Sequence, residues 1–215
     1  MTSNGTTTST NGSTPKVDVS MATSPNKIKA VPGLVKQIIA GADTLSESGD
    51  QAGHDLLIKA RTVVQSLETS RETRAKHCWA QTGAIAGLSF GVETGLWKLM
   101  ASNGDRPQKV SELAKSLDVD ASLLGRLMRH LGAMGYINET DADVYLPTNY
   151  AKAMSIPIIS DGYLAMLTCS SAAPIKFHKY LRKRGFNNPT DSLDQSMLPC
   201  RCPFWQSQSR RARIH

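Results

Sequence analysis

Residues 109–147 read KVSELAKSLDVDASLLGRLMRHLGAMGYINETDADVYLP, and this stretch decides the predicted fold. Apolar residues recur in it at the helical spacing i, i+3, i+4, i+7: Val110, Leu113, Ala114 and Leu117. This spacing predicts a short helix with one apolar face. Residues 118–120 should end that helix, and the carboxylate of Asp120 is placed to accept amide hydrogen bonds at the start of a second helix.

The second helix has its own apolar face, formed by Leu124, Leu127, Met128, Leu131 and Met134. Gly135 follows, where a left-handed residue would end the helix. Two short apolar runs, 136–137 and 144–146, flank a polar turn and read as a β-hairpin. The sequence therefore predicts a mainly α fold, a winged helix-turn-helix with a small two-stranded wing.

Further helices are predicted on both sides of this unit, at residues 32–39, 56–67, 78–100, 148–154 and 161–184, with Pro174 breaking the last. A Gly/Ser-rich gap is expected at residues 46–53, and residues 156–159 are expected to connect two helices. The stretch 78–100 is nearly free of charge, and an uncharged helix is buried on most sides. Because one small domain offers too little surface to bury it, long flanking helices that form a homodimer are predicted.

Composition divides the chain into three predicted segments. Residues 1–26 begin as a Ser/Thr/Asn/Gly tract and are predicted to be a disordered tail. Residues 27–190 are predicted to form one domain, and residues 191–215 an irregular tail whose last part resembles read-through from a shifted frame. The start of the chain lacks a signal-peptide pattern, and the longest uncharged run is too short for a bilayer. A soluble, cytoplasmic protein without a membrane partner is expected.

The net charge of +7 would suit nucleic acid, so its distribution matters. Much of the excess lies outside the predicted winged helix, in two late clusters: Lys176, Lys179, Arg182, Lys183, Arg184, and Arg201, Arg210, Arg211, Arg213. Arg126 and Arg129, with Ala133, project opposite the apolar face of the second helix and could read bases. The wing carries Glu139, Asp141 and Asp143, which would repel phosphate. A DNA-binding regulator is therefore the alternative function, and a nucleic-acid partner is disfavoured.

No catalytic or metal constellation can be placed on the sequence. The five histidines are scattered, and His130 is expected to be a solvated or helix-end residue. The four cysteines have no framework spacing and are predicted to be free thiols in a reducing compartment. Cys200 and Cys202 could coordinate a soft metal ion, but the sequence does not supply a second pair of ligands after them. The sequence predicts neither catalytic nor metal-binding residues.

Several motifs resemble the N-terminal dimerisation domain of fungal secondary-metabolite O-methyltransferases, relatives of the plant caffeate and flavonoid enzymes. The matching segments are Phe90–Leu99 (FGVETGLWKL), Val110–Ala114 (VSELA), Leu124–Tyr136, Tyr145–Thr148 (YLPT) and Lys183–Asp191 (KRGFNNPTD). Their order and spacing together cover about residues 30–195. The resemblance implies a helical dimerisation region belonging to an S-adenosylmethionine-dependent enzyme.

Full-length members of that family continue into a Rossmann-like domain that binds the cofactor at a glycine-rich turn. After Ser160 this sequence has only Gly162 and Gly185, far apart, and the family's histidine base belongs to that same domain. The chain is therefore expected to lack the catalytic domain and to bind no S-adenosylmethionine. By the resemblance, the helices after the wing line the mouth of a pocket for an aromatic, polyketide-type substrate. The residues implied there are Tyr163, Met166, Leu167 and Phe177.

Three functions remain open at this point, and with them whether the chain is an enzyme. It is a truncated O-methyltransferase relative that cannot transfer methyl groups by itself, an auxiliary subunit that dimerises with a full-length homologue, or a winged-helix DNA-binding regulator. Methyl transfer by this chain alone is unsupported in each of them.

Overall fold

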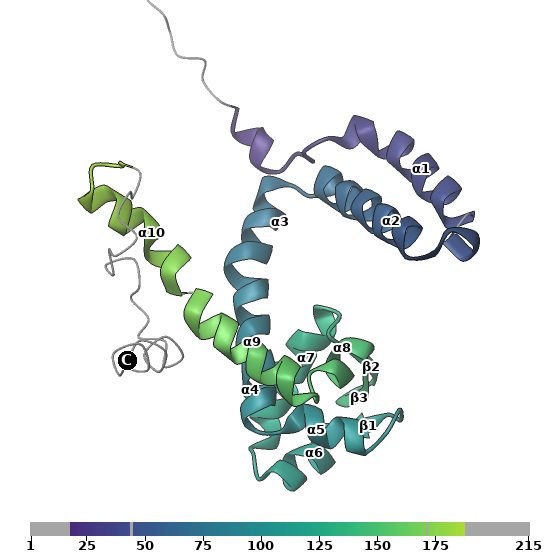
Figure 1. The fold of residues 1–215 in the computed structure, drawn as a ribbon, viewed down its shortest axis with the longest axis vertical. Coiled ribbons are helices and arrows are strands. Elements are labelled where there is room, and N and C mark those ends of the chain that lie inside the picture. Colours follow the sequence, from purple (N-terminus) through teal and green to yellow (C-terminus); the bar gives the residue numbers. More distant parts are fainter. Residues whose placement is uncertain (1–17, 44, 171, 188–215) are drawn as a thin grey trace, which may run out of the picture. The chain divides into compact units, whose positions relative to one another are not determined.

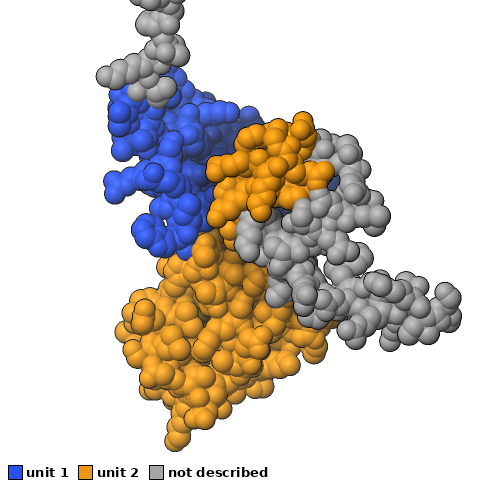
Figure 2. Space-filling model, turned by 90° about the vertical axis from the view of Figure 1, so that its left-hand side faces the viewer, with its two compact units in different colours: residues 1–79 blue, residues 80–215 orange. Residues whose placement is uncertain are grey.

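The computed structural model describes residues 18–187, except residues 44 and 171. The described chain is mainly helical with one small three-stranded sheet, which confirms the predicted fold class (Figure 1). It divides into two compact units, residues 1–79 and 80–215 (Figure 2), where the sequence predicted one domain over 27–190. Residues 1–17 and the predicted tail at 191–215 lie outside the described residues.

The first unit is built on a hairpin of two helices, α1 (Val31–Asp43) and α2 (Leu45–Leu67). The helices run antiparallel and pack against each other (Figure 1), and a Cβ added to Gly41 would meet Leu56 Cδ1 at 3.6 Å. The Gly/Ser-rich gap predicted at residues 46–53 was wrong, because these residues belong to α2. Helix propensity is a weak prior, and packing against a neighbouring helix overrides it.

Residues 18–26, predicted to be disordered, have defined structure. The carboxylate of Asp18 caps the short helix η1 (Val19–Ala22) by accepting a hydrogen bond from Ser20 N at 3.0 Å. The chain then crosses the end of α2, where Asn26 Nδ2 donates to Gln65 O at 3.1 Å and Lys27 N donates to Ser66 O at 3.0 Å. These donors satisfy carbonyls that a helix end leaves unpaired, and this is why the segment is ordered. A second short helix, η2 (Ile28–Ala30), leads into α1.

α3 (Ser70–Ala75) follows α2 after a capping box. Thr69 Oγ1 accepts from Glu72 N at 3.2 Å, and Glu72 Oε2 accepts from Thr69 N at 2.9 Å. The helix continues into a π-helical turn, η3 (Lys76–Ala80), so the predicted helix at 78–100 begins inside this turn. An ion pair between Lys76 and Glu68 connects the turn to the end of α2.

None of the described hydrophobic side chains of the first unit is buried. Leu34, Ile38, Leu56 and Val63 are half-buried. A further set on α1 and α2 is between 40% and 59% exposed: Val35, Ile39, Leu57, Val64 and Leu67. The helical hairpin therefore leaves an apolar surface that its own described residues do not cover.

In the second unit, α6 (Val110–Leu117) and α7 (Ala121–Ala133) form the predicted helix-turn-helix. Asp118 ends α6 in the left-handed region (φ 54°), and Asp120 Oδ1 accepts from Leu123 N at 2.7 Å at the start of α7. Gly135 takes φ 79° after α7, as predicted. Of the predicted apolar faces, six residues are 4% exposed or less (Val110, Leu113, Ala114, Leu124, Met128 and Leu131), and Leu117, Leu127 and Met134 are half-buried.

The predicted hairpin consists of β2 (Ile137–Asp141) and β3 (Val144–Pro147). Its turn is shorter than the predicted one, because β2 extends to Asp141, which pairs with Val144. Asp143 supplies the left-handed residue of the turn (φ 56°). A third antiparallel strand, β1 (Gln108–Lys109), pairs with β3, so the strand order is β1-β3-β2. The added strand expands the predicted two-stranded wing to three strands.

The uncharged stretch 78–100 is partly buried within its own unit. α4 (Gln81–Glu93) and α5 (Leu96–Ser102) meet at Gly95 (φ 78°). A stripe of three glycines on α4 lies against large side chains: Gly83 against His130, Gly87 against Leu131, and Gly91 against Trp97. Close packing of α4 on α7 therefore explains part of the absence of charge, which the sequence analysis explained by a partner subunit, with packing inside the same chain as the alternative.

The chain after the sheet forms α8 (Asn149–Ala153), α9 (Pro157–Ser170) and α10 (Ala172–Lys183). The predicted connector at 156–159 was mostly wrong, because α9 begins at Pro157; proline is favoured at the first position of a helix. The stretch 161–184 forms two helices, as predicted, and Pro174 occupies the third position of the second one, α10, within its first turn. None of the described helices has the length and apolar composition needed to cross a membrane.

Candidate substrate-binding surface

Three of the four residues proposed for substrate contact lie within one turn of α9. Tyr163 and Leu167 are half-buried, and Tyr163 packs against the core of the second unit. Met166 lies between them in sequence and is 70% exposed. Phe177 lies on α10, 40% exposed, with its ring 6.4 Å from that of Tyr180 and nearly parallel to it. The structure thus brings together Tyr163, Met166 and Leu167, and places Phe177 with Tyr180 on the next helix.

Tyr163 has two tyrosine neighbours that the sequence analysis did not select. The rings of Tyr136, just after α7, and Tyr150, on α8, lie 5.1 Å apart at an angle of 54°. Burial, together with the phenol groups of Tyr150 and Tyr136, raises the pKa of Tyr163 to about 12. Burial also raises the pKa of Tyr150, with a smaller contribution from Tyr136. Tyr136 was assigned to the wing and Tyr150 to a short helix, and no spacing in the sequence connects them to Tyr163.

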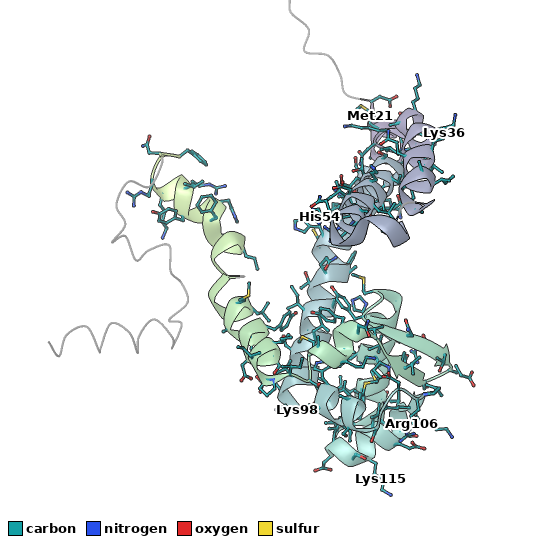
Figure 3. The ribbon with its side chains drawn as sticks, turned by 45° about the vertical axis from the view of Figure 1, so that its right-hand side comes forward. Met21, Lys36, His54, Lys98, Arg106 and Lys115 are labelled. Carbon is teal, nitrogen blue, oxygen red and sulfur yellow. The ribbon has the colours of Figure 1, made fainter. Side chains whose placement is uncertain are left out.

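A small cavity of about 60 Å³ lies at the corner between α4 and α5, next to the start of α9. It is lined by Gly91, Val92, Gly95, Trp97, Lys98 (Figure 3), Met154, Ser160 and Asp161. A water molecule takes about 30 Å³, whereas pockets for small organic ligands are about 300 Å³ or larger. This cavity therefore has room for water but not for an aromatic substrate, and none of the four proposed contact residues lines it.

Two open hollows lie beside η1 and α3 in the first unit, with volumes of about 470 Å³ and 340 Å³. The larger is lined by Asp18, Val19, Met21 (Figure 3), Ala22, Ser24, Pro25, Asn26 and Ser70, and the smaller by Thr23, Thr69, Arg71, Glu72 and Ala75. Each contains one carboxylate, and hydrogen bonds from Ser20 and Thr69 lower the pKa of Asp18 and of Glu72, respectively. Both carboxylates act as helix caps, so neither hollow offers a group placed for acid–base chemistry.

Of the two arginines considered for DNA readout, one forms an ion pair with a described residue and the other does not. Arg129 Nη2 contacts Asp143 Oδ1 at 3.1 Å, across α7 and the hairpin turn. Arg126 is exposed and makes no ion pair among the described residues. Neutralising one arginine with an acidic residue of the hairpin weakens the attraction for phosphate. The structure gives the DNA-binding alternative no support.

The histidines do not form a metal or catalytic site in the described part of the chain. His130 lies in the last turn of α7, the helix-end position that was one of the two roles expected for it; it is half-buried, and its Nε2 lies 2.9 Å from Ala80 O. Among the described residues, no three His, Cys, Asp or Glu side chains are grouped to hold a metal ion. Cys78 is exposed and forms no disulfide bond with a described residue, and the metal site considered at Cys200 and Cys202 lies outside the described residues.

Comparison with known proteins identifies relatives among fungal enzymes. No family model matches the chain. The O-methyltransferase mfmE of Annulohypoxylon moriforme is 26% identical over 151 residues, which is 70% of this chain and 37% of that protein. The O-methyltransferase desB of Aspergillus desertorum is 31% identical over 117 residues, 54% of this chain and 28% of that protein. The chain is related to fungal secondary-metabolite O-methyltransferases, and the matched region spans about a third of the length of these curated relatives.

Solved structures show the same fold. A pericyclic reaction enzyme superposes with a TM-score of 0.68 at 22% identity, covering 86% of this chain and 47% of that one. OxaC, in complex with SAH and oxaline, gives a TM-score of 0.61 at 24% identity, covering 75% of this chain and 41% of that one. These likenesses extend the resemblance from single motifs to the arrangement of the helices.

Proposed function

We propose that this chain provides the dimerisation and substrate-contact region of a fungal O-methyltransferase system that acts on an aromatic, polyketide-type compound in the cytoplasm. In this proposal the winged helix serves as an interaction module and not as a DNA reader. The relationship to fungal O-methyltransferases and the shared fold support it. In this proposal, the described residues of the chain do not transfer a methyl group by themselves.

The observation that carries the dimerisation part is the uncovered apolar surface of the first unit. Two helices can bury only the faces that they turn to each other, and here none of the described hydrophobic residues of that unit is buried. Trp79, in the π-helical turn, is 80% exposed, and Ile85 on α4 is 36% exposed. A second copy of this chain, or a full-length homologue, would cover such surfaces with matching helices.

The substrate contacts are proposed at Tyr163, Met166, Leu167 and Phe177. Met166 and Phe177 are apolar and exposed, and the half-buried Tyr163 and Leu167 lie one turn or less from Met166 on α9. Methionine and aromatic side chains are common in pockets for apolar ligands. These four residues would contribute one apolar wall, completed by residues from elsewhere.

The described residues are not suited to hold S-adenosylmethionine. Nucleoside cofactors are bound where a glycine-rich turn follows a parallel strand and begins a helix. The described sheet is entirely antiparallel, and in the described chain no glycine lies between a strand and the helix that follows it. Methyl transfer by these residues alone is therefore not expected.

Sedimentation velocity at micromolar concentrations tests the proposal. A dimer is expected, and replacing two exposed residues of the hairpin, Leu57→Glu and Val64→Glu, should shift the protein to the monomer. Lys36→Glu on exposed α1 is the matched control and should leave the dimer intact. A well-folded monomer with a cooperative melt would contradict the dimerisation part.

Calorimetric titration with S-adenosylmethionine tests the cofactor part in the same preparation. A dissociation constant below about 100 μM, equivalent to roughly 5.5 kcal/mol, would contradict it. Co-purification with a full-length relative would favour the auxiliary form of the proposal over the homodimer.

A further inference from the structure

Residues 18–27, which we term the capping segment, lie at the end of α2 and are held there by few contacts. Asn26 N donates to Glu68 O at 3.2 Å, and Lys27 N donates to Ser66 O at 3.0 Å. Every residue of the capping segment is exposed. A segment with few buried contacts opens at a low cost in free energy. The capping segment can therefore detach from α2 while the helical hairpin stays folded.

The capping segment contains a serine followed by a proline, in the sequence Ser24-Pro25-Asn26-Lys27. Ser24 lies between the short helices η1 and η2, outside any helix or strand. Such a backbone suits the extended conformation in which kinases bind their substrates. Proline has no amide hydrogen, so it fits the position after the acceptor only in kinases that need no hydrogen bond there. Lys27 adds a positive charge three residues after the acceptor, where a kinase carboxylate could pair with it.

The sequence supplies its own comparison for this motif. Thr14-Pro15 is the other place where a hydroxyl residue precedes a proline, and the residue three positions after Thr14 is the uncharged Val17. Thr14 lies outside the described residues. Of the two motifs, the one at Ser24 therefore combines the proline with a basic residue at the third position.

A phosphate on Ser24 would weaken the hold of the capping segment on α2. Ser24 Oγ donates to Ser20 O at 3.0 Å, and a phosphorylated oxygen has no hydrogen left to donate. Ser24 also lines the same open hollow as Asp18, whose carboxylate caps η1. A phosphate carries a charge of about −2 at neutral pH and is repelled by a nearby carboxylate. Because the segment opens easily, even a modest repulsion shifts it toward the detached state.

We propose that Ser24 is a phosphorylation site for a proline-directed protein kinase, and that its phosphate releases the capping segment from α2. In the transfer, Ser24 Oγ bonds to the γ-phosphorus of ATP, the bond from that phosphorus to the β-phosphate oxygen breaks, and ADP leaves. The hydroxyl proton goes to the catalytic aspartate of the kinase. Release would leave Ser66 O and Glu68 O, at the end of α2, to hydrogen-bond with water. This regulation goes beyond the proposed function and requires neither a dimer nor a bound substrate.

The site is tested by incubating the full chain with a purified cyclin-dependent kinase and Mg-ATP. Tandem mass spectrometry then locates the phosphate and follows its incorporation with time. Phosphate is expected on Ser24 in the wild type and is lost from this position in Ser24→Ala. Lys27→Ala should slow the reaction by about tenfold or more, the size of one charge-assisted contact. Lys29→Ala removes an exposed lysine two residues further along and is the matched control, with an unchanged rate.

Phosphate on Thr14 alone, or on neither residue, would overturn Ser24 as the site. If Lys27→Ala reacted as fast as Lys29→Ala, the role assigned to Lys27 would be wrong.

Amide hydrogen exchange tests the release of the capping segment. In the phosphorylated chain, the amides of Asn26 and Lys27 should exchange faster than in the unmodified chain, because their acceptors belong to the end of α2. Ser24→Ala removes the hydroxyl hydrogen bond without adding charge, so it should speed this exchange less than the phosphate does. The amide of Leu124, bonded to Asp120 O in the second unit, is the internal control and should not change.

Exchange at an unchanged rate would overturn the release. Slower exchange would overturn it too, and would mean that the phosphate pairs with a cation of α3. Arg71 is the residue for that outcome, because it lines the neighbouring hollow together with Thr23. None of these measurements depends on dimerisation or on methyl transfer, so their failure leaves the proposed function as it stands.

Discussion

Trp79 and Trp97 lie on either side of the boundary between the two units, and their surroundings differ as the units do. Trp97 is 1% exposed, and its Nε1 donates to Leu88 O at 3.1 Å. Trp79 is 80% exposed. The second unit surrounds Trp97 with helices from several directions, while the described part of the first unit consists of a helical hairpin and short helices.

The difference shows that amphipathic helices alone do not make a core. α2 is longer than any described helix of the second unit, with 23 residues against 14 for α9. Yet the buried hydrophobic residues of the described chain all belong to the second unit, where a sheet and helices on several sides exclude water together. A side chain is buried when neighbours cover it from more than one direction, and a hairpin offers only one.

The largest expected effect distinguishes the two tryptophans. Trp97→Ala should lower the free energy of unfolding by about 3–5 kcal/mol, because it leaves a cavity in the core and removes a buried hydrogen bond. Trp79→Ala should change it by less than about 0.5 kcal/mol, as for other exposed positions. Urea denaturation at low protein concentration, where association contributes least, measures both. If both variants lost a similar free energy of unfolding, the contrast between the two units would be wrong.

Two glycines give a smaller contrast of the same kind. A Cβ on Gly91 would collide with the indole of Trp97, whereas one on Gly33 of α1 would find no atom within 4 Å. Gly91→Ala should cost about 1–3 kcal/mol through overpacking. Gly33→Ala should be neutral or stabilise by up to about 1 kcal/mol, because alanine favours the helix. Thermal melts of the two variants check this, and a stabilised Gly91→Ala would show that Trp97 is free to move.

The smallest effect appears only in alkali and concerns the second unit, which contains all five tyrosines. Burial, and the hydrogen bond to Glu139, raise the pKa of Tyr145 to about 12. An unfolded tyrosine loses its proton near pH 10. The stabilisation by neutral Tyr145 is therefore complete below pH 10 and is lost as the pH rises through 12.

Tyr145→Phe should flatten the decline of stability between pH 10 and 12 without removing it, because Tyr163 has a similarly raised pKa. Stability measured by urea denaturation at several pH values gives the slope. An unchanged slope in the variant would mean that Tyr145 ionises in the folded protein as readily as in the unfolded chain.

The helix-turn-helix could be predicted because its signals are local. Periodic apolar residues, the Asp120 cap and Gly135 each depend on residues within a few positions, and all three are formed as predicted. Strand β1 was missed because it has only two residues, and its pairing of Gln108 with Tyr145 crosses 37 positions of sequence (145 − 108). Nothing local in Gln108 and Lys109 indicates a strand.

The candidate site was predicted only in part for the same reason. Tyr163, Met166 and Leu167 are one turn of a helix, so their spacing placed them together. Tyr136 and Tyr150 approach Tyr163 through tertiary packing, which sequence spacing does not encode. The helix-end position of His130 could be predicted, but its contact with Ala80 O could not, because the two residues are fifty positions apart.

The glycine stripe on α4 restricts how this gene can change. Every single-base substitution that alters a glycine codon to that of another amino acid introduces a side chain with a Cβ. At Gly83 and Gly87 that atom would stand 2.7 Å from His130 Nε2 and 3.1 Å from Leu131 Cγ. Such changes require the facing side chain on α7 or α5 to shift or to become smaller. Divergence along this helix should therefore proceed by paired replacements, while a position such as Gly33 is free to change alone.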